Sequence, residues 1–222
     1  MRRYFGRLRL VVRREGLLAV ARHLGRRAVH KVMLRERHIW YSLPLDGGRP
    51  RRELPAGFRL RRATAADVDA IAAVPGQPRE AVLRERLGGT AAVYVVDQGA
   101  HTAFACSVFE ERTPTVASES GWLDLPAGIA CVEDVGTAPE FRGRGIAPGA
   151  WSALADDLAR RGFATLVMKV EVANASSRSA AAKVGFGEAA DMRLRRIGPL
   201  MHVALTPLGA PGADFIIELL SR

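Results

Sequence analysis

Hydrophobic and polar positions follow two spacings along the chain, one of two residues and one of three to four. Alternation at every second residue is typical of strands, and the longer spacing is typical of helices with one buried face. Strands are predicted at 39–45, 58–62, 91–96, 103–109, 129–135, 164–172, 188–197 and 201–205. Helices are predicted after residue 64, at 78–87, 147–161 and 176–183, and as one or two turns within 214–220. Strands and helices that intermix in this way indicate an α/β chain.

Turn and cap residues mark two of the boundaries between these elements. Gln98 and Gly99 join two of the strands into an antiparallel hairpin. Thr64 followed three residues later by Asp67 resembles a capping box, so a helix is expected to begin there directly after a strand.

Other boundaries are predicted from proline and glycine. The short strand at 39–45 contains Pro44, and proline suits the edge of a sheet or the end of a strand because it donates no hydrogen bond. Two Gly and two Pro make 46–55 a predicted linker. The segment 112–127 is predicted to be a polar loop.

The first part of the chain predicts a basic helical arm. Apolar residues recur at helical spacing from Tyr4 to Val32, with Arg and Lys on the other faces. Two or three short helices are expected, with breaks near Gly16 and Gly25, because glycine costs ~1 kcal/mol relative to alanine inside a helix. We therefore divide the chain into 1–53 (arm, short strand and linker) and 54–222 (main domain).

Composition and charge support this division. The chain has 222 residues and 24.0 kDa, of which 48% are hydrophobic and 25% charged, as expected for one globular domain with an appendage. Residues 1–53 hold 15 Lys and Arg and 4 Asp and Glu, whereas 54–222 hold 18 and 19. The net charge of +10 therefore belongs to the arm.

No segment predicts a membrane span or export. Bilayer-spanning helices need ~18 to 20 continuous apolar residues, and the longest uncharged apolar run near the start is 17–21. The pair Arg2 and Arg3 is not followed by the hydrophobic stretch of an export signal. We expect a cytoplasmic protein.

The role of the arm stays open among three interpretations. Its apolar stripe packs on the domain and leaves the arginines solvated, or it docks on an anionic membrane surface or a protein partner, or it forms an electrostatic footprint for RNA. Nucleic acid is disfavoured because the arm lacks a dense aromatic platform and the domain is nearly neutral. A homodimer is also left open.

Cysteine and histidine positions predict no metal site. Cys106 and Cys131 lie in apolar, strand-like stretches, where a buried free thiol is the commonest state, and two cysteines cannot form a disulfide framework. The five histidines show no metal-ligand spacing.

The strongest chemical signal is a glycine-rich turn between the strand at 129–135 and the following helix. Gly143 and Gly145 let the backbone turn, and main-chain amides at a helix N-terminus bind anions. Arg142 and Arg144 add positive charge. The Lys-Ser/Thr pair of a nucleoside-triphosphate loop and the G-x-G-x-x-G pattern of a dinucleotide fold are both missing. The turn therefore predicts a phosphate cradle of another kind.

These residues resemble the GNAT superfamily of N-acetyltransferases. The family's pyrophosphate motif, R/Q-x-x-G-x-G/A, looks like 142–147, and its second signature, N-x-x-S/A followed by K-x-G-F, looks like 174–177 and 183–186. The opening 61–67 also looks like the family's first strand and helix. The matches occur in the family's order within 58–205, so the arm lies outside the resemblance.

The resemblance implies a fold and a cofactor. The fold is a mixed, mostly antiparallel sheet, flanked by helices and split between its fourth and fifth strands, with acetyl-coenzyme A or another acyl-coenzyme A in the split. The residues implied to bind it are Val135, Gly136, Thr137, Arg142, Gly143, Arg144, Gly145, Ile146, Ala147, Asn174, Ser177 and Lys183. For Asn174, a helix cap is an equally good interpretation.

The implied reaction is direct transfer of the acyl group to a primary amine of a small molecule or peptide. An alkylammonium group with a pKa of ~10.4 is almost fully charged at neutral pH, so attack on the thioester needs a proton acceptor. Glu133 and Asp134 are the candidate catalytic carboxylates. Neighbouring strand residues point to opposite faces, so only one should face the acceptor, and we choose Glu133. The alternative is a solvated strand end or a structural salt bridge.

The sequence departs from the family at one position. Many members carry a tyrosine that protonates the leaving thiolate where this chain has Ala181. A thiol with a pKa of ~8.5 is already a tolerable leaving group, so water or Ser179 could serve. The same gap fits a wider channel for a longer acyl chain or a carrier protein. It also fits the alternative function, a non-catalytic coenzyme A binding or RNA-associated protein, including one like the toxins that acetylate aminoacyl-tRNA.

Overall fold

The computed structural model describes residues 33–197, 200–212 and 214–220. The helices expected between Tyr4 and Val32 lie outside these residues. The chain divides into a larger unit, Arg37–Met192 with Leu205–Arg222, and a smaller one, Met1–Glu36 with Arg193–Ala204. The residues of the predicted site all belong to the larger unit.

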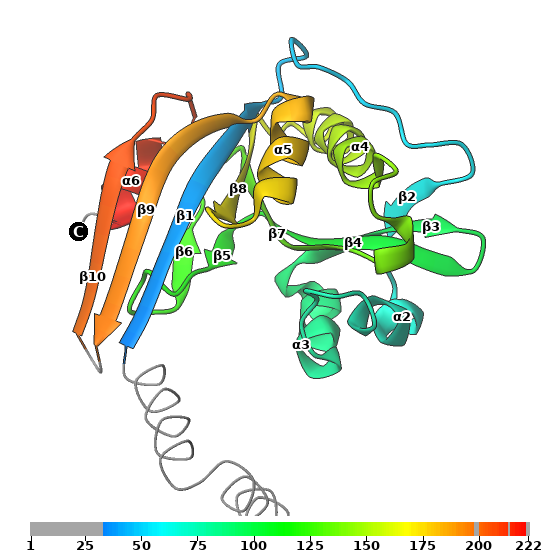
Figure 1. Cartoon of the computed structure of the whole chain (residues 1–222), viewed down its shortest axis with the longest axis horizontal. Coiled ribbons are helices and arrows are strands. Elements are labelled where there is room, and N and C mark those ends of the chain that lie inside the picture. Colours follow the sequence, from blue (N-terminus) through cyan, green and yellow to red (C-terminus); the bar gives the residue numbers. More distant parts are fainter. Residues whose placement is uncertain (1–32, 198–199, 213, 221–222) are drawn as a thin grey trace, which may run out of the picture. The chain divides into compact units, whose positions relative to one another are not determined.

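Eight strands form one mixed sheet (Figure 1). They are β1 (Met33–Pro44), β2 (Arg59–Arg62), β3 (Ala92–Gln98), β4 (His101–Phe109), β7 (Ile129–Thr137), β8 (Thr165–Glu171), β9 (Gly187–Ile197) and β10 (Leu200–Pro207), in the order β10-β9-β1-β8-β7-β4-β3-β2. The pairs β1–β8, β2–β3, β3–β4 and β4–β7 are antiparallel, whereas β7 and β8 are parallel. This arrangement confirms the predicted mixed, mostly antiparallel sheet.

Helices cover both faces of the sheet. The helical elements are η1 (Ala65–Asp67), α2 (Val68–Ala72), α3 (Glu80–Glu85), η2 (Arg86–Thr90), η3 (Pro139–Phe141), α4 (Ile146–Arg160), α5 (Ala175–Val184) and α6 (Asp214–Leu220). Val93 and Val95 of β3 pack with Val68 and Ile71 of α2. The alternate β3 residues Tyr94 and Val96 belong to the cluster that includes α4, so α2 and α4 lie on opposite faces. None of the described helices is long and apolar enough to cross a bilayer.

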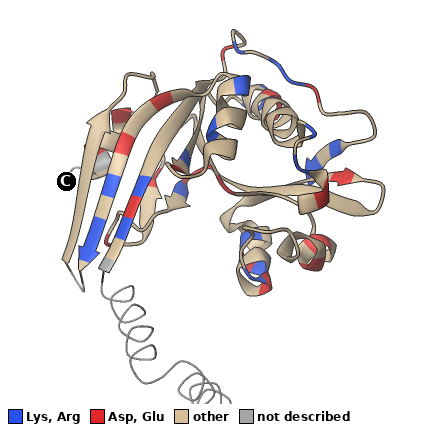
Figure 2. Cartoon of the chain, viewed as in Figure 1, with Lys and Arg blue, Asp and Glu red and all other residues tan. Residues whose placement is uncertain are grey.

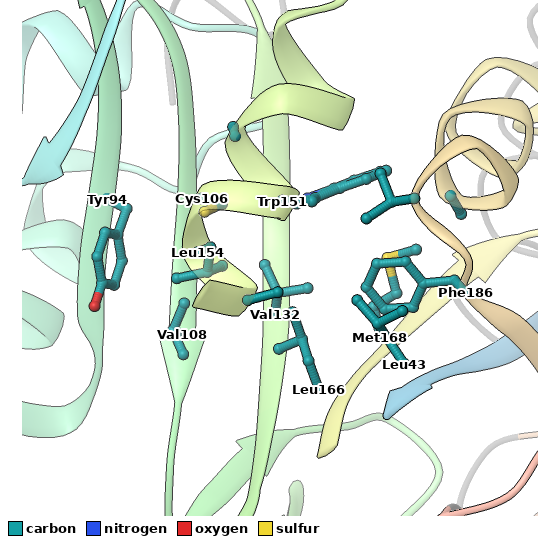
Figure 3. Packing of buried hydrophobic residues seen from close by; sticks show 14 of the residues in the cluster. Leu43, Tyr94, Cys106, Val108, Val132, Trp151, Leu154, Leu166, Met168 and Phe186 are labelled. Carbon is teal, nitrogen blue, oxygen red and sulfur yellow. The ribbon is translucent and has the colours of Figure 1, made fainter. Parts of the chain in front are cut away.

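The main core lies between the sheet and the helices α4 and α5 (Figure 3). Trp151 of α4 packs edge-on against Phe186, with ring centroids 5.9 Å apart. Leu154 of the same helix is buried in the cluster that includes Val132 and Met168 of the sheet. Cys106 and Cys131 are buried free thiols, as predicted. Basic and acidic residues are interspersed along the strands and helices of the described residues (Figure 2).

Two sequence predictions need correction. The short strand expected at 39–45 is β1, which begins six residues earlier, at Met33, and lies inside the sheet, between β9 and β8. Pro44 is its last residue, so of the two places expected for this proline, an edge or a strand end, the structure shows the end. The polar loop expected at 112–127 contains a small second sheet of β5 (Arg112–Pro114) and β6 (Trp122–Asp124). Strands of three residues are too short to show a recognisable period.

The predicted linker packs on α4. The backbone amide of Arg52 donates to Ser152 Oγ at 3.0 Å. A Cβ atom at Gly149 would lie 2.8 Å from the carbonyl oxygen of Glu53, so only glycine allows this close approach. The linker therefore ties β1 to the helix that follows the cradle.

An ion-pair cluster anchors the start of the helical segment 65–90. The Thr64–Asp67 capping box is present, as predicted. Arg61 of β2 donates to both carboxylate oxygens of Asp67, at 2.7 and 2.9 Å, and to Asp97 of β3 at 2.7 Å. The hydrogen bonds from Arg61 hold the pKa of Asp67 well below its usual range.

Asp67→Asn is expected to lower the melting temperature at neutral pH. The difference in melting temperature between the wild type and this variant is expected to become smaller as the pH is lowered. The lowered pKa means that the carboxylate stabilises the fold above its unfolded-state pKa of ~3.9 and loses that contribution as the pH falls toward the folded-state value. Thermal melts of both proteins from neutral pH to about pH 3 measure this. Asp69→Asn is the matched control, because Asp69 is 86% exposed and lies 3.9 Å from Arg84. A deficit independent of pH would contradict the prediction.

Candidate active site

The two parallel strands at the centre of the sheet separate part of the way along. β7 and β8 pair over three positions only, from Ile129 with Thr165 to Cys131 with Val167. Beyond these pairs, residues 132–135 and 168–171 form two walls of an open cleft with a volume of about 110 Å³. The cleft lies where the resemblance implied a split, between the fourth and fifth strands of the domain's main sheet, β7 and β8.

A bulge in β7 accompanies the separation. Ala105 of β4 pairs with Gly136, and Ser107 pairs with Glu133, so one β4 residue lies opposite Asp134 and Val135. Asp134 has a φ of 49°, which is rare for a residue other than glycine. Because a bulge bends its strand and removes backbone groups from the ladder, it explains why β7 leaves β8 at this point.

Glu133 forms a buried ion pair across the cleft with Lys169 of β8. Lys169 Nζ donates to Glu133 Oε1 and, at 3.0 Å, to the carbonyl oxygen of Pro114, and it lies 5.5 Å from the ring centroid of Trp40. The two charged side chains are only 12% and 14% exposed. Burial raises the pKa of Glu133, and Lys169 opposes that rise. Burial acts to lower the pKa of Lys169, but the attraction and hydrogen bond of Glu133, together with Cys131 and Asp134, outweigh it and raise the pKa.

Asp134 pairs with Arg86 of η2. Arg86 Nη1 donates to Asp134 Oδ2 and, at 2.8 Å, to Ser107 Oγ. Ser107 lies directly opposite Glu133, so the two acidic side chains lie on the same face of the sheet. The expectation that they point to opposite faces is therefore wrong, because the bulge at Asp134 interrupts the alternation.

The cleft has an apolar side and an acidic side. Val132, Met168 and Trp151 line it and belong to the core cluster under α4 and α5. Glu133, Asp134 and Lys169 line it on the opposite face of the sheet. Glu171, two residues beyond Lys169 on β8, shares that face and is exposed.

The glycine-rich turn forms the N-terminus of α4. Gly143 and Gly145 have φ values of 76° and 78°, and a Cβ atom at either would meet nothing within 4 Å. Glycine is therefore needed here for its backbone conformation and not for space. The amides of Ile146 and Ala147 lie in the first helical turn, where an intrahelical acceptor is absent, so they suit an anion. The same helix carries Trp151 into the cleft wall.

The arginines of the turn extend this basic surface. Arg142 Nε donates to the carbonyl oxygen of Thr137 at 3.2 Å, and the Arg144 guanidinium lies 5.4 Å from the ring centroid of Phe141. Both arginines are exposed. The turn thus combines main-chain donors with positive charge, which is the chemistry of a diphosphate site.

The remaining predicted residues divide between the cleft and other places. Asn174 caps α5, because its Oδ1 accepts from the Ser177 amide at 3.1 Å, and both residues line the cleft. Val135 also lines it. Gly136 and Thr137 continue β7 in pairing with β4, whereas Lys183 is exposed near the C-terminus of α5 and is not a cleft-lining residue. Ala181 is fully buried in the core, and Ser179 is exposed outside the cleft lining.

The sequence analysis missed several residues of the site. Among them are Val132, Trp151, Met168, Lys169, Val170 and Glu171, which line the cleft, and Arg86, which binds Asp134. A lysine inside the otherwise apolar run 166–170 was a usable signal, because a charge in a buried strand requires a partner. Arg86 carried no such signal, since its role depends on a contact 48 positions away in the chain.

Comparisons with known proteins agree with this geometry. Residues 72–186 match the model of the acetyltransferase (GNAT) family. Similar solved structures include a Drosophila protein, with 14% identity, a TM-score of 0.56, and coverage of 82% of this chain and 58% of that one. A GCN5-related N-acetyltransferase from Sphaerobacter thermophilus has 17% identity, a TM-score of 0.52, and coverage of 84% and 57%.

A GNAT-family acetyltransferase from Colwellia psychrerythraea has 17% identity, a TM-score of 0.52, and coverage of 75% of this chain and 57% of that one. The chain thus spans less than two thirds of the length of each of these three structures. At such identities the likeness concerns the fold. No curated protein matches the chain significantly.

Lys169→Met is expected to destabilise the protein by about 3 to 5 kcal/mol near pH 8, because it leaves an ionised carboxylate buried without its cation. Lys169 opposes the rise in the pKa of Glu133, so its removal raises that pKa further. A carboxyl group whose pKa is raised in the folded state stabilises the fold at low pH, and this contribution is lost as the pH rises. The loss of unfolding free energy in Lys169→Met is therefore expected to be smaller at pH 5 than at pH 8. Urea denaturation at both pH values measures it.

The control is Lys169→Met combined with Glu133→Leu. It removes both charges and is expected to recover most of the stability, because an apolar pair replaces the ion pair. Equal deficits of the single variant at pH 5 and pH 8 would show that Glu133 does not respond to Lys169.

Proposed function

Since the chain belongs to the GNAT family of acetyltransferases, we propose that it transfers an acyl group from acyl-coenzyme A directly to a primary amine of a small molecule or peptide. The observation that carries this proposal is the cleft between β7 and β8, which has an apolar side and a side with carboxylates. A thioester with its alkyl arm suits the first side, and an amine suits the second.

The donor that we propose is acetyl-coenzyme A, with other acyl-coenzyme A molecules as alternatives. The turn at Gly143 and Gly145 fits its diphosphate because open main-chain amides, a helix N-terminus and two arginines meet there. The donor supplies an activated thioester carbonyl. Val135, Asn174 and Ser177, which line the cleft, would orient the part of the donor between the diphosphate and the thioester.

Glu133 is the proposed proton acceptor for the attacking amine. Burial raises its pKa above the usual range of a glutamate, and a base becomes more effective as its pKa approaches the working pH. When Glu133 becomes neutral, Lys169 keeps the Pro114 carbonyl and the Trp40 ring as partners, so its charge remains stabilised. The buried ion pair thus keeps Glu133 ionised at rest and tolerates its protonation.

Coenzyme A binding without turnover is the second candidate function. The observation that favours it is Ala181, which is fully buried in the core where many relatives have a tyrosine. The described cleft lining offers no tyrosine that could protonate the leaving thiolate.

A thiol-release assay with acetyl-coenzyme A and a panel of primary amines separates the two functions. Glu133→Gln is expected to lower kcat by ~100-fold or more, because the base is lost while the hydrogen bond to Lys169 can persist. Glu119→Gln, a change at an exposed glutamate outside the cleft lining, is the matched control. Turnover that is unchanged in Glu133→Gln would remove Glu133 from the mechanism. Tight donor binding without turnover for any amine would favour the second function.

The acidic side of the cleft also indicates the class of acceptor. Lys169 offsets Glu133, and Arg86 offsets Asp134. Among the described residues Glu171 forms no ion pair, although it lines the same cleft about 7 Å from Lys169 along the strand. A second positive charge on the acceptor, such as the distal ammonium of a diamine, fits this carboxylate.

Glu171→Gln is expected to raise KM for 1,4-diaminobutane about two- to fivefold, which corresponds to the free energy of one solvent-exposed ion pair. KM for butylamine, which has the same length and no distal charge, is expected to stay unchanged. Steady-state kinetics with both amines measure the difference. Equal shifts for the two amines, or none, would remove Glu171 from acceptor recognition.

A further inference from the structure

The strained residue of the cleft wall, Asp134, is held at two points by one helical segment. Gln77, between α2 and α3, binds its main-chain carbonyl, and Arg86 of η2 binds its carboxylate. We propose that Gln77 and Arg86 are positioning residues for acyl transfer, which fix the β7 bulge and thereby the width of the cleft. This inference rests on the proposed function for its link to catalysis.

Gln77 replaces hydrogen bonds that the bulge removes from the sheet. Its Nε2 donates to the carbonyl oxygen of Ala105 on β4, at 3.1 Å, and to that of Asp134 on β7. These carbonyls belong to the two strands whose register shifts between Ala105 and Ser107. A side-chain amide nitrogen carries two hydrogens, so one group can bridge both strands.

The loop that carries Gln77 packs directly on the bulged strand. A Cβ atom at Gly136 would lie 2.5 Å from the carbonyl oxygen of Pro75 and 2.9 Å from Val74 Cγ1. Glycine at 136 is therefore a requirement of this contact. Val68 and Ile71 of α2 anchor the loop in the second core cluster, together with Ala105 of β4. The loop is thus anchored through α2 in a core cluster, and we call Gln77 and Arg86 together the clamp of the bulge.

Arg86 supplies the second point of attachment. Its side chain is 10% exposed, lies 5.2 Å from the ring centroid of Phe109, and donates to Asp134 and Ser107. A φ of 49° costs of order 1 kcal/mol or more for a residue other than glycine, so Asp134 needs contacts that fix it. Asp134 therefore acts as an anchor of the bulge, which leaves Glu133 as the residue that handles the proton.

The bulge determines which part of the β7 main chain faces the cleft. Val135, the second bulged residue, lines the cleft between the base Glu133 and the strand end that leads to the cradle. If Asp134 relaxed to an ordinary strand conformation, β7 could straighten toward β8 and narrow the space for the donor. Loss of the clamp should therefore weaken donor binding more than it slows the chemical step.

Gln77→Met tests this, because methionine keeps the length and volume of glutamine and removes the amide. We expect about a tenfold rise in the dissociation constant and KM for acetyl-coenzyme A, corresponding to the loss of two partly buried hydrogen bonds, with a much smaller change in kcat. Faster hydrogen exchange of the backbone amides at 135–137 is expected in the free protein. Gln98→Met is the matched control, since the chain contains only these two glutamines.

A double-mutant cycle with Asp134→Gly makes the test specific. Glycine adopts a φ of about 49° unaided, so the effect of Gln77→Met on exchange and affinity is expected to be smaller in that background. The inference is overturned if Gln77→Met and Gln98→Met show the same hydrogen-exchange rates at 135–137 and the same affinity for acetyl-coenzyme A. The proposed function is refuted, but the role of Gln77 in fixing the bulge is not, if the wild type neither binds nor turns over the donor while Gln77→Met still exchanges faster.

Discussion

The site depends on one interruption of backbone pairing. β7 and β8 share only three residue pairs before the bulge at Asp134 takes β7 away from its neighbour. Backbone groups and side chains that would otherwise be buried in a continuous sheet then face a cleft. Such an interruption is costly, because buried backbone groups must find other partners. The carbonyl of Asp134 finds its partner in Gln77, which belongs to a different part of the chain.

The bulge also places two carboxylates side by side on the acidic side of the cleft. Two adjacent carboxylates at the edge of a core would repel each other, and each is stabilised by its own cation, Glu133 by Lys169 and Asp134 by Arg86. The cations come from opposite sides of the split, since Lys169 lies on β8 and Arg86 lies beyond α3. The pair of Glu133 with Lys169 thus links the two walls of the cleft, whereas the pair of Asp134 with Arg86 links β7 to the helical segment beside it.

The two sides of the cleft, to which we assign the proposed donor and acceptor, lie on opposite faces of the sheet. α4 begins at the glycine-rich turn and continues along the apolar side, so in the proposed function its N-terminus and Trp151 would contact the same ligand, the donor. The acidic side lies on the opposite face, where Glu133 and Glu171 project. In the proposed function, an acyl group in the split would therefore meet an amine that arrives from the other face, without either ligand displacing the other.

The sequence by itself determined the local features, which depend only on residues close together in the chain. The turn at Gly143 and Gly145, the Asn174 cap and the Thr64 capping box follow from local backbone preferences, and the predicted strands and helices follow from their periods. Only the tertiary structure decided which side chains meet. The pairing of Glu133 with Lys169, the grip of Gln77 on Asp134 and the inclusion of β1 in the sheet join residues 36 or more positions apart. Hydrophobic periodicity says that a face is buried, whereas the partner of each charge depends on how distant elements pack together.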